Sequence, residues 1–198
     1  MRKPIIIAGM ALIAIQFMNA CNSKATEQEK KAELAPVSQE DKVKTGELLV
    51  AKLDCEICHS PKKMGPQGPE VIPGQRFGGH HANVPLPPTD EKILKSGWVL
   101  FAPDFTSFIG PWGQSYAANI SSDSTGIGLW TEEQFKKVIR EGKFKGLDNT
   151  RPILPPMPWP AYKNLNDEEI SAVFAFLKST TPVHNVVPEA KIAAPPKM

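Results

Sequence analysis

The run AKLDCEICHSPKK at residues 51–63 holds two of the chain's three cysteines, Cys55 and Cys58, with His59 directly after the second. A redox dithiol gives the histidine no role, and a zinc site needs further ligands, usually a second Cys or His pair that this sequence lacks. Covalent haem attachment needs two thiols at helical spacing and an adjacent imidazole for the iron. The motif therefore predicts one haem c bound through Cys55 and Cys58, with His59 as an axial ligand. Structural thiols and a zinc knuckle are the alternatives.

Met157 is the residue that we expect as the sixth iron ligand. It lies in RPILPPMPWP, where prolines on both sides restrict the backbone and leave the thioether little conformational freedom to lose. A soft, neutral thioether favours ferrous iron and raises the reduction potential, which suits an electron carrier. His80 or His81 in GGHHAN is the alternative ligand, although an exposed loop pair is the plainer interpretation. Met64 is too close to His59 in sequence to reach the opposite haem face.

The identity of the sixth ligand separates two functions. With a protein ligand the iron is closed and the protein is an electron carrier, not an enzyme. With an open sixth position it is a haem enzyme or gas sensor, such as a peroxidase-like module. The sequence contains no phosphate-binding loop, catalytic triad or paired carboxylates that would indicate other catalysis.

Several further residues are expected near the haem, each with a plainer alternative. Gly126 and Gly128 in SSDSTGIG let backbone approach the porphyrin, or form a simple turn with Asp123. Tryptophans are expected as core or haem wall, and two arginines as partners of a propionate or as solvated side chains. These residues are Trp112, Trp130, Trp159, Arg140 and Arg151, and the remaining histidine, His184, is expected at the surface.

The N-terminus has the layout of an export signal, with two basic residues followed by the short apolar core IIIAGMALIAI. That core is shorter than the roughly 20 residues needed to span a bilayer. The run FMNAC is similar to a bacterial lipobox, so we expect residues 1–20 to be a signal peptide and Cys21 to be lipidated. An ordinary secretory signal cut near Ala20 is the alternative. Since haem is attached outside the cytoplasm, we expect a lipoprotein on the periplasmic side of the bacterial envelope.

The remaining chain divides into a polar linker, one compact domain and a tail. Residues 21–40 carry balanced charges and few apolar side chains, which is typical of a flexible spacer. Residues 41–182 are long enough for one domain, and residues 183–198 form a proline-rich tail that wraps the surface or is disordered. The net charge of +2 and the lack of a long basic run do not suggest nucleic acid as a partner.

Three helices are predicted, at about 41–55, 131–141 and from 166 onward. Capping boxes at Thr131 with Gln134 and at Asn166 with Glu169 begin the second and third, and Gly142 ends the second. No alternating strand pattern of any length is present, and residues 60–130 are mainly loop. A large apolar cofactor gives such long loops a surface to pack on. We therefore expect a mostly α fold with long loops wrapped around one haem.

The order of these features resembles the monohaem domain of bacterial c-type cytochromes over about residues 41–182. It is most similar to cytochrome modules that accompany periplasmic dehydrogenases, through YAANISSDSTGIGLWTEEQF and PPMPWPAYKNLNDEEISAVFAFLKS. This resemblance implies a redox partner that is such a dehydrogenase or another respiratory-chain protein. It also implies that Gly46 meets an aromatic ring where two helices cross, with Phe174 in that role. The carbonyl of Pro69, or as second choice Pro73, is expected to accept the free N–H of the haem histidine.

Overall fold

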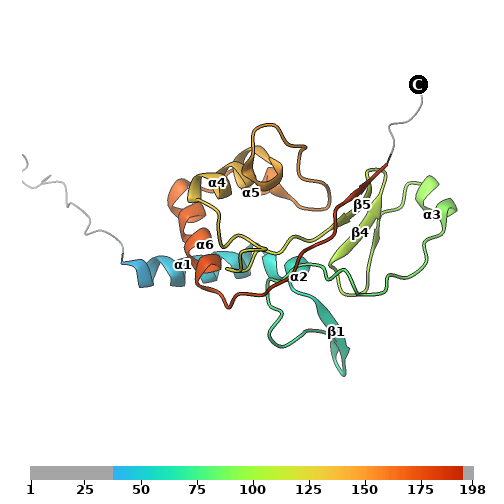
Figure 1. Ribbon diagram of the computed structural model, residues 1–198, viewed down its shortest axis with the longest axis horizontal. Coiled ribbons are helices and arrows are strands. Elements are labelled where there is room, and N and C mark those ends of the chain that lie inside the picture. Colours follow the sequence, from blue (N-terminus) through green and yellow to red (C-terminus); the bar gives the residue numbers. More distant parts are fainter. Residues whose placement is uncertain (1–37, 194–198) are drawn as a thin grey trace, which may run out of the picture. The chain divides into compact units, whose positions relative to one another are not determined.

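The capping boxes predicted at Thr131 and Asn166 are both present, and each begins a helix. In the computed structural model, which describes residues 38–193, α4 spans Glu132–Glu141 and α6 spans Asp167–Ser179 (Figure 1). Helix α4 ends at Gly142, whose φ of 62° is the left-handed conformation that favours glycine. The expected signal peptide and Cys21 lie outside the described residues.

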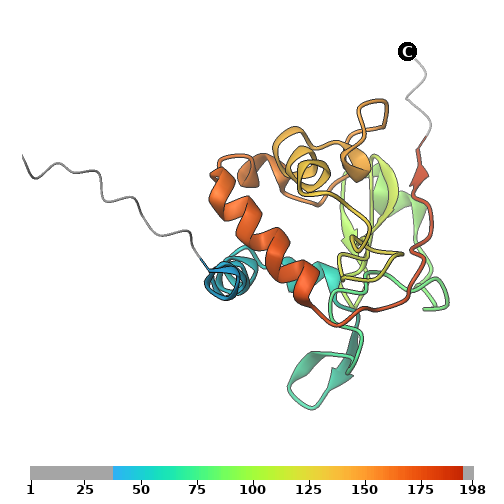
Figure 2. The same ribbon diagram turned by 60° about the vertical axis from the view of Figure 1, so that its left-hand side comes forward.

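Helix α1, Gln39–Lys52, begins at the N-cap Ser38 and crosses α6 (Figure 2). A β-carbon at Gly46 would lie 1.9 Å from the Ala172 carbonyl oxygen and 2.7 Å from Cβ of Phe176. The expected crossing is therefore present, but the aromatic residue at Gly46 is Phe176. Phe174 points to another side of α6 and packs against Phe135, with ring centroids 5.3 Å apart.

Short strands accompany the helices, so the expected mostly α fold is a helical domain that also contains some sheet. Hairpin β1 (Lys62–Gly65) and β2 (Gly68–Val71) stands apart from an antiparallel sheet of order β3-β4-β5-β6. Those four strands are Leu100–Phe101, Ser107–Gly110, Gly113–Tyr116 and Lys191–Ile192. Of the described residues, 34% are helical and 14% are in strands, and strands of two to four residues are too short to show alternation in sequence.

The shorter helices connect these elements. They are α2 (Cys55–His59), α3 (Glu91–Lys95), the 3-10 turn η1 (Phe144–Gly146) and α5 (Trp159–Tyr162). Between residues 38 and 193, no helix is both long and apolar enough to cross a membrane.

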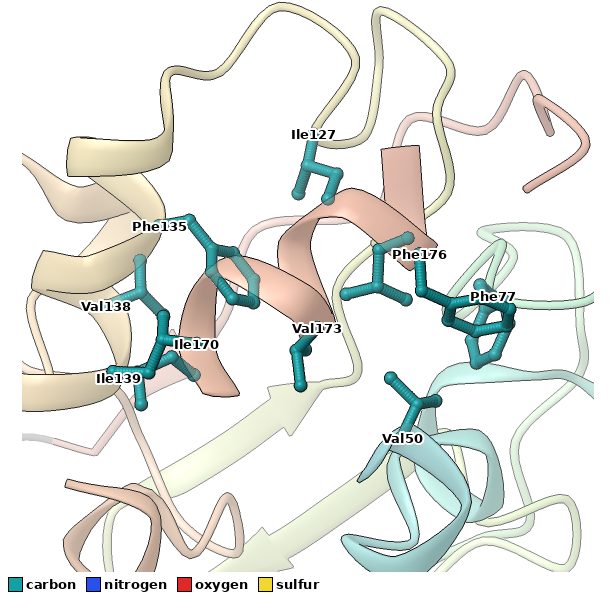
Figure 3. Packing of buried hydrophobic residues seen from close by; sticks show 10 residues of the cluster. Val50, Phe77, Ile127, Phe135, Val138, Ile139, Ile170, Val173 and Phe176 are labelled. Atoms are coloured by element: carbon teal, nitrogen blue, oxygen red, sulfur yellow. The ribbon is translucent and has the colours of Figure 1, made fainter. Parts of the chain in front are cut away.

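The hydrophobic core lies between α1, α4 and α6. Figure 3 shows Phe135, Val138 and Ile139 of α4 next to α6, and Val50 of α1 beyond them. Phe77, which is fully buried, meets Phe176 edge to face with ring centroids 6.1 Å apart. Helix α2 follows α1 directly, so this cluster fixes the position of α2 relative to α4 and α6.

After α6 the chain continues past residue 182, the expected end of the domain, and residues 183–193 lie on the same compact unit. Val183 and Asn185 are buried, and β6 pairs with β5, Gly113 opposite Ile192. Figures 1 and 2 show this segment running from the end of α6 to the sheet. The segment thus joins the helical and the sheet halves of the described unit.

Candidate cofactor site

A cavity of about 780 Å³ lies between α2, α4, α6, the sheet and the C-terminal segment. Its volume falls within the range of small-molecule and cofactor sites, roughly 300–1,000 Å³. Apolar side chains of α4 and α6, such as Val138, Ile139 and Val173, make up much of its wall. Cys55, Cys58, His59 and Met157 all line it.

Cys55 and Cys58 lie three residues apart on α2, a spacing that puts both thiols on one face of a helix. Neither forms a disulfide. Burial is the main cause that raises the pKa of Cys55, to about 11, and burial likewise raises the pKa of Cys58. Burial therefore disfavours the thiolate form of both side chains, which lie close to the histidine that follows them.

The His59 ring is oriented by a backbone carbonyl. Its Nδ1 lies 2.7 Å from the oxygen of Ala118, and because a carbonyl can only accept, Nδ1 carries the proton. Burial lowers the pKa of His59, so the ring is neutral at pH 7. In this tautomer Nε2 keeps its lone pair, which is the form of imidazole that binds a metal.

The expectation that Pro69 or Pro73 supplies this carbonyl is wrong. Pro69 lies in β2, where it pairs with Met64 across the β1–β2 hairpin, and it does not line the cavity. The β1–β2 hairpin holds residues 62–71 away from His59. The backbone carbonyl of Ala118, which follows β5, accepts the hydrogen bond from His59 instead. Nothing in the side chain of an alanine identifies it as a hydrogen-bond acceptor, so no pattern in the sequence could have indicated it directly.

Met157 lines the cavity from a loop that two hydrogen bonds hold in place just before this residue. The Ile153 N–H donates to the Gly142 carbonyl at 2.7 Å, and the Ser115 hydroxyl donates to the Pro155 carbonyl at 2.6 Å. The indole N–H of Trp112 in turn donates to Ser115 at 3.1 Å. Trp112 therefore supports the loop that carries Met157, without lining the cavity itself.

His80 and His81, the alternative ligands, are absent from the lining of this cavity. His80 is 2% exposed, stacks on Tyr116 with ring centroids 4.7 Å apart, and its Nδ1 lies 2.7 Å from the Thr106 hydroxyl oxygen. Thr106 donates its own hydroxyl to Asp104 at 2.7 Å, so it accepts from His80. His80 thus supports the cavity wall through Tyr116, which does line the cavity.

The remaining expected pocket residues divide between the cavity and its surroundings. Gly126, Trp130 and Arg151 line the cavity, whereas Gly128 and Trp159 do not. A β-carbon at Gly128 would lie 2.2 Å from the Ser122 carbonyl oxygen, which explains the glycine by close packing of the loop on itself.

Three charged or aromatic candidates have partners outside the cavity. Trp159 packs on Gly142, where a β-carbon would lie 2.3 Å from Cε2 of the indole. Arg140 forms an ion pair with Asp167 at 2.6 Å. His184 is exposed and lies 3.4 Å from a carboxylate oxygen of Asp123.

Sequence reasoning missed two parts of the wall. Phe108, Ser115 and Tyr116 come from the short strands, and residues 186–190 with Ile192 come from the C-terminal segment. The prolines and the lack of periodicity in this segment did not indicate that it lines the cavity, because it contacts residues that are far away in the chain.

The donors around this cavity fit a haem c. Two thiols on one helix face match two thioether bonds, a neutral imidazole with Nε2 available matches one axial ligand, and a thioether matches the other. Among residues 38–193, no three or more His, Cys, Asp and Glu side chains are grouped so that they could hold a metal ion.

Comparison with known proteins finds one family and several similar proteins. A family model described as Cytochrome c matches residues 43–181. The gluconate 2-dehydrogenase cytochrome c subunit of Pantoea cypripedii is 30% identical over 150 residues, which are 75% of this chain and 24% of the relative. The fructose dehydrogenase cytochrome subunit of Gluconobacter japonicus is 30% identical over 109 residues, 54% of this chain and 20% of the relative.

A third similar protein is the cytochrome c subunit of the quinone-type alcohol dehydrogenase of Gluconobacter oxydans, 37% identical over 81 residues. Those residues are 40% of this chain and 15% of the relative. The chain thus spans no more than 24% of the length of these three relatives.

Proposed function

The chain belongs to the cytochrome c family, and from this membership we propose that it is a monohaem electron carrier. Cys55 and Cys58 hold one haem c through thioether bonds, and His59 and Met157 are the axial ligands of its iron. The observation that carries this proposal is that all four side chains, from two distant parts of the chain, line one cavity. The sequence contains a single C-x-x-C-H motif, which supports one haem per chain.

The bound haem supplies reversible one-electron oxidation and reduction. The protein's own residues set the conditions for it. The Ala118 carbonyl fixes the His59 ring and raises its basicity, and the apolar wall from α4 and α6 keeps water away. The thioether of Met157 would favour the reduced iron, so we propose a higher potential than two nitrogen ligands would give.

We propose a dehydrogenase, or another respiratory-chain protein, as the redox partner. Support comes from the names of the relatives, which include cytochrome subunits of gluconate and fructose dehydrogenases. In this role the chain carries electrons and does not itself transform a substrate. The competing function, a haem enzyme or gas sensor with an open sixth position, is disfavoured by Met157 in the cavity wall.

We also propose that the protein is a lipoprotein on the periplasmic side of the bacterial envelope. Residues 1–20 serve as the signal peptide, Cys21 carries the lipid, and residues 21–40 link the lipid to the domain. The support is the FMNAC sequence and the apolar core before it, because Cys21 lies outside the described residues.

The test of the proposed function compares Met157→Ala with Met64→Ala in the haem-loaded protein. Met64 is a matched control, since it is 72% exposed on the β1–β2 hairpin and does not line the large cavity. In wild type, acidified organic solvent should leave the haem on the chain, and mass spectrometry should find it on the peptide with Cys55 and Cys58. Met157→Ala should lose the weak sulfur-to-iron band at the red edge of the visible spectrum, and its reduced form should bind carbon monoxide readily.

Met64→Ala should keep the wild-type spectrum and stay closed to carbon monoxide. Free extraction of haem from wild type would contradict covalent attachment. A Met157→Ala variant that retains the band, or a wild type that already binds carbon monoxide quickly, would favour the open-site function.

A further inference from the structure

The C-terminal segment contributes one buried polar side chain, Asn185, to the loop beside the histidine. Asn185 is 8% exposed, and its side-chain amide donates to two backbone carbonyls, of Gly78 at 2.7 Å and of His80 at 3.0 Å. Its own backbone N–H donates to the Thr125 hydroxyl at 3.0 Å. Both amide hydrogens of Asn185 are therefore used on residues 78–80, more than 100 positions earlier in the chain.

Two backbone N–H groups of this loop donate hydrogen bonds to the backbone that holds His59. The Gly79 N–H donates to the His59 carbonyl at 2.8 Å, and the His80 N–H donates to the Ala117 carbonyl at 2.9 Å. Gly79 has a φ of 72°, and a β-carbon there would lie 2.5 Å from the carbonyl carbon of Ala118. This loop therefore lies tightly between Asn185 on one side and the His59–Ala118 hydrogen bond on the other.

The residue after Ala118 is bonded to the same C-terminal segment. The Asn119 side chain, 5% exposed, donates to the Val183 carbonyl at 2.8 Å and to the Asn185 carbonyl at 3.2 Å. Val183 also packs closely against Gly78, where a β-carbon would lie 2.7 Å from Cγ1 of Val183. The acceptor of the His59 proton is thus fixed by contacts that converge on residues 183–185.

We propose that Asn185 is a positioning residue for the haem histidine. Asn185 does not line the cavity, but it holds residues 78–80 against Ala117 and Ala118 and so keeps the Ala118 carbonyl in place for the His59 N–H. This inference rests on the proposed role of His59 as an iron ligand. A firm hydrogen bond at this N–H makes the imidazole a stronger donor and lowers the reduction potential. Removing the Asn185 amide should loosen that bond and raise the potential.

The test uses the full-length, haem-loaded protein with Asn185→Ala, and His184→Ala as the matched control. His184 is the adjacent residue, but its side chain is exposed. In Asn185→Ala we expect a higher reduction potential and exchange of the His59 Nδ1 proton, followed by NMR, that is roughly fivefold to tenfold faster. His184→Ala should match wild type in both measurements. A role in folding alone would lower stability and leave the reduction potential unchanged, and that result would overturn the proposal.

A wild-type measurement keeps the proposal testable if Asn185→Ala does not fold. Native-state hydrogen exchange at increasing denaturant should show the Asn185 side-chain amide, the Gly79 N–H and the His59 Nδ1 proton opening together, with one free energy. Exchange of the His59 proton without opening of Asn185 would overturn the proposal. Wild type without haem or without His59 ligation would instead contradict the proposed function, so the two failures are distinguishable.

Discussion

At the scale of single residues, Gly46 has the most demanding position in the helical core. A β-carbon there would lie 1.9 Å from the carbonyl oxygen of Ala172. That oxygen belongs to the backbone of α6, inside a regular helix, and so it cannot rotate away as a side chain could. Only a residue without a β-carbon lets α1 and α6 approach this closely, and their crossing directs α2 toward the cavity.

We predict that Gly46→Ala lowers the free energy of unfolding by about 1–3 kcal/mol or more, the usual cost of an added group in a packed core. The direction of this change is informative, because the same glycine-to-alanine substitution at an exposed position inside a helix raises the free energy of unfolding by about 1 kcal/mol. Urea denaturation measures the effect. Glu47→Ala, the adjacent exposed position on α1, is the control and should change stability by no more than about 0.5 kcal/mol. An equally stable Gly46→Ala variant would show that the helices separate at no cost.

The residues of the site differ in how far the sequence could predict them. The spacing of Cys55, Cys58 and His59 is local, and all three share α2 and one cavity wall. The acceptor for the His59 proton could not be found, because Ala118 contributes only a backbone carbonyl. The aromatic partner of Gly46 was misplaced by two positions, since the crossing geometry sets which face of α6 meets α1 and local spacing does not.

At the scale of elements, local signals were sufficient for helices and insufficient for strands. The starts of α4 and α6 are given by capping boxes, whose members lie three residues apart. Strands β5 and β6 depend on a pairing between Gly113 and Ile192, far apart in sequence. Their few residues carry no periodicity, so only the folded chain reveals that they belong to one sheet.

The loop at residues 121–128 is organised by one carboxylate. Oδ1 of Asp123 accepts from the Thr125 N–H at 2.8 Å and from the Thr125 hydroxyl at 2.6 Å. The Asp123 carbonyl accepts from the N–H groups of Gly126 and Gly128, each at 2.9 Å. Because Gly126 lines the cavity, this turn positions part of the cavity wall.

The same carboxylate makes the stability of the loop depend on pH. Hydrogen bonds from Thr125 are the main cause that lowers the pKa of Asp123, and the nearby His184 adds to the effect. A lowered pKa in the folded state means that the stabilisation is present above the ordinary Asp pKa, about 3.9, and is lost as the pH falls through the lower folded value.

We therefore predict that Asp123→Asn is less stable than wild type at pH 7 and that the difference shrinks as the pH falls below about 4. Urea denaturation at several pH values measures the free energy of unfolding of both proteins as a function of pH. Ser124→Ala, at an exposed position in the same loop, should give a small difference that does not vary with pH. If the difference in the free energy of unfolding between Asp123→Asn and wild type does not change with pH, the charge of Asp123 contributes nothing to stability.

At the scale of the whole molecule, the cavity wall is assembled from parts that are distant in sequence. Asn185 bonds to Gly78 across 107 positions, and Met157 lies in a loop nearly 100 residues after His59. Residues 183–198 were expected as a tail. Of these, residues 186–190 and Ile192 line the cavity, and Lys191–Ile192 complete the sheet. Such contacts have no local periodicity, which is why the sequence indicates the cofactor far better than the wall around it.

The last prediction concerns how the whole protein is held in the envelope. If Cys21 is the lipidated first residue of the mature chain, its acyl chains each add about 0.8 kcal/mol of membrane affinity per buried methylene. Replacing Cys21 with Ser removes the acceptor for the lipid but leaves Cys55 and Cys58 for the haem. We expect Cys21→Ser to move from the membrane to the soluble periplasmic fraction while it still stains for covalent haem. Ser23→Ala, two residues later, should stay with the membrane. Unchanged membrane association of Cys21→Ser would show that something other than this lipid holds the protein there.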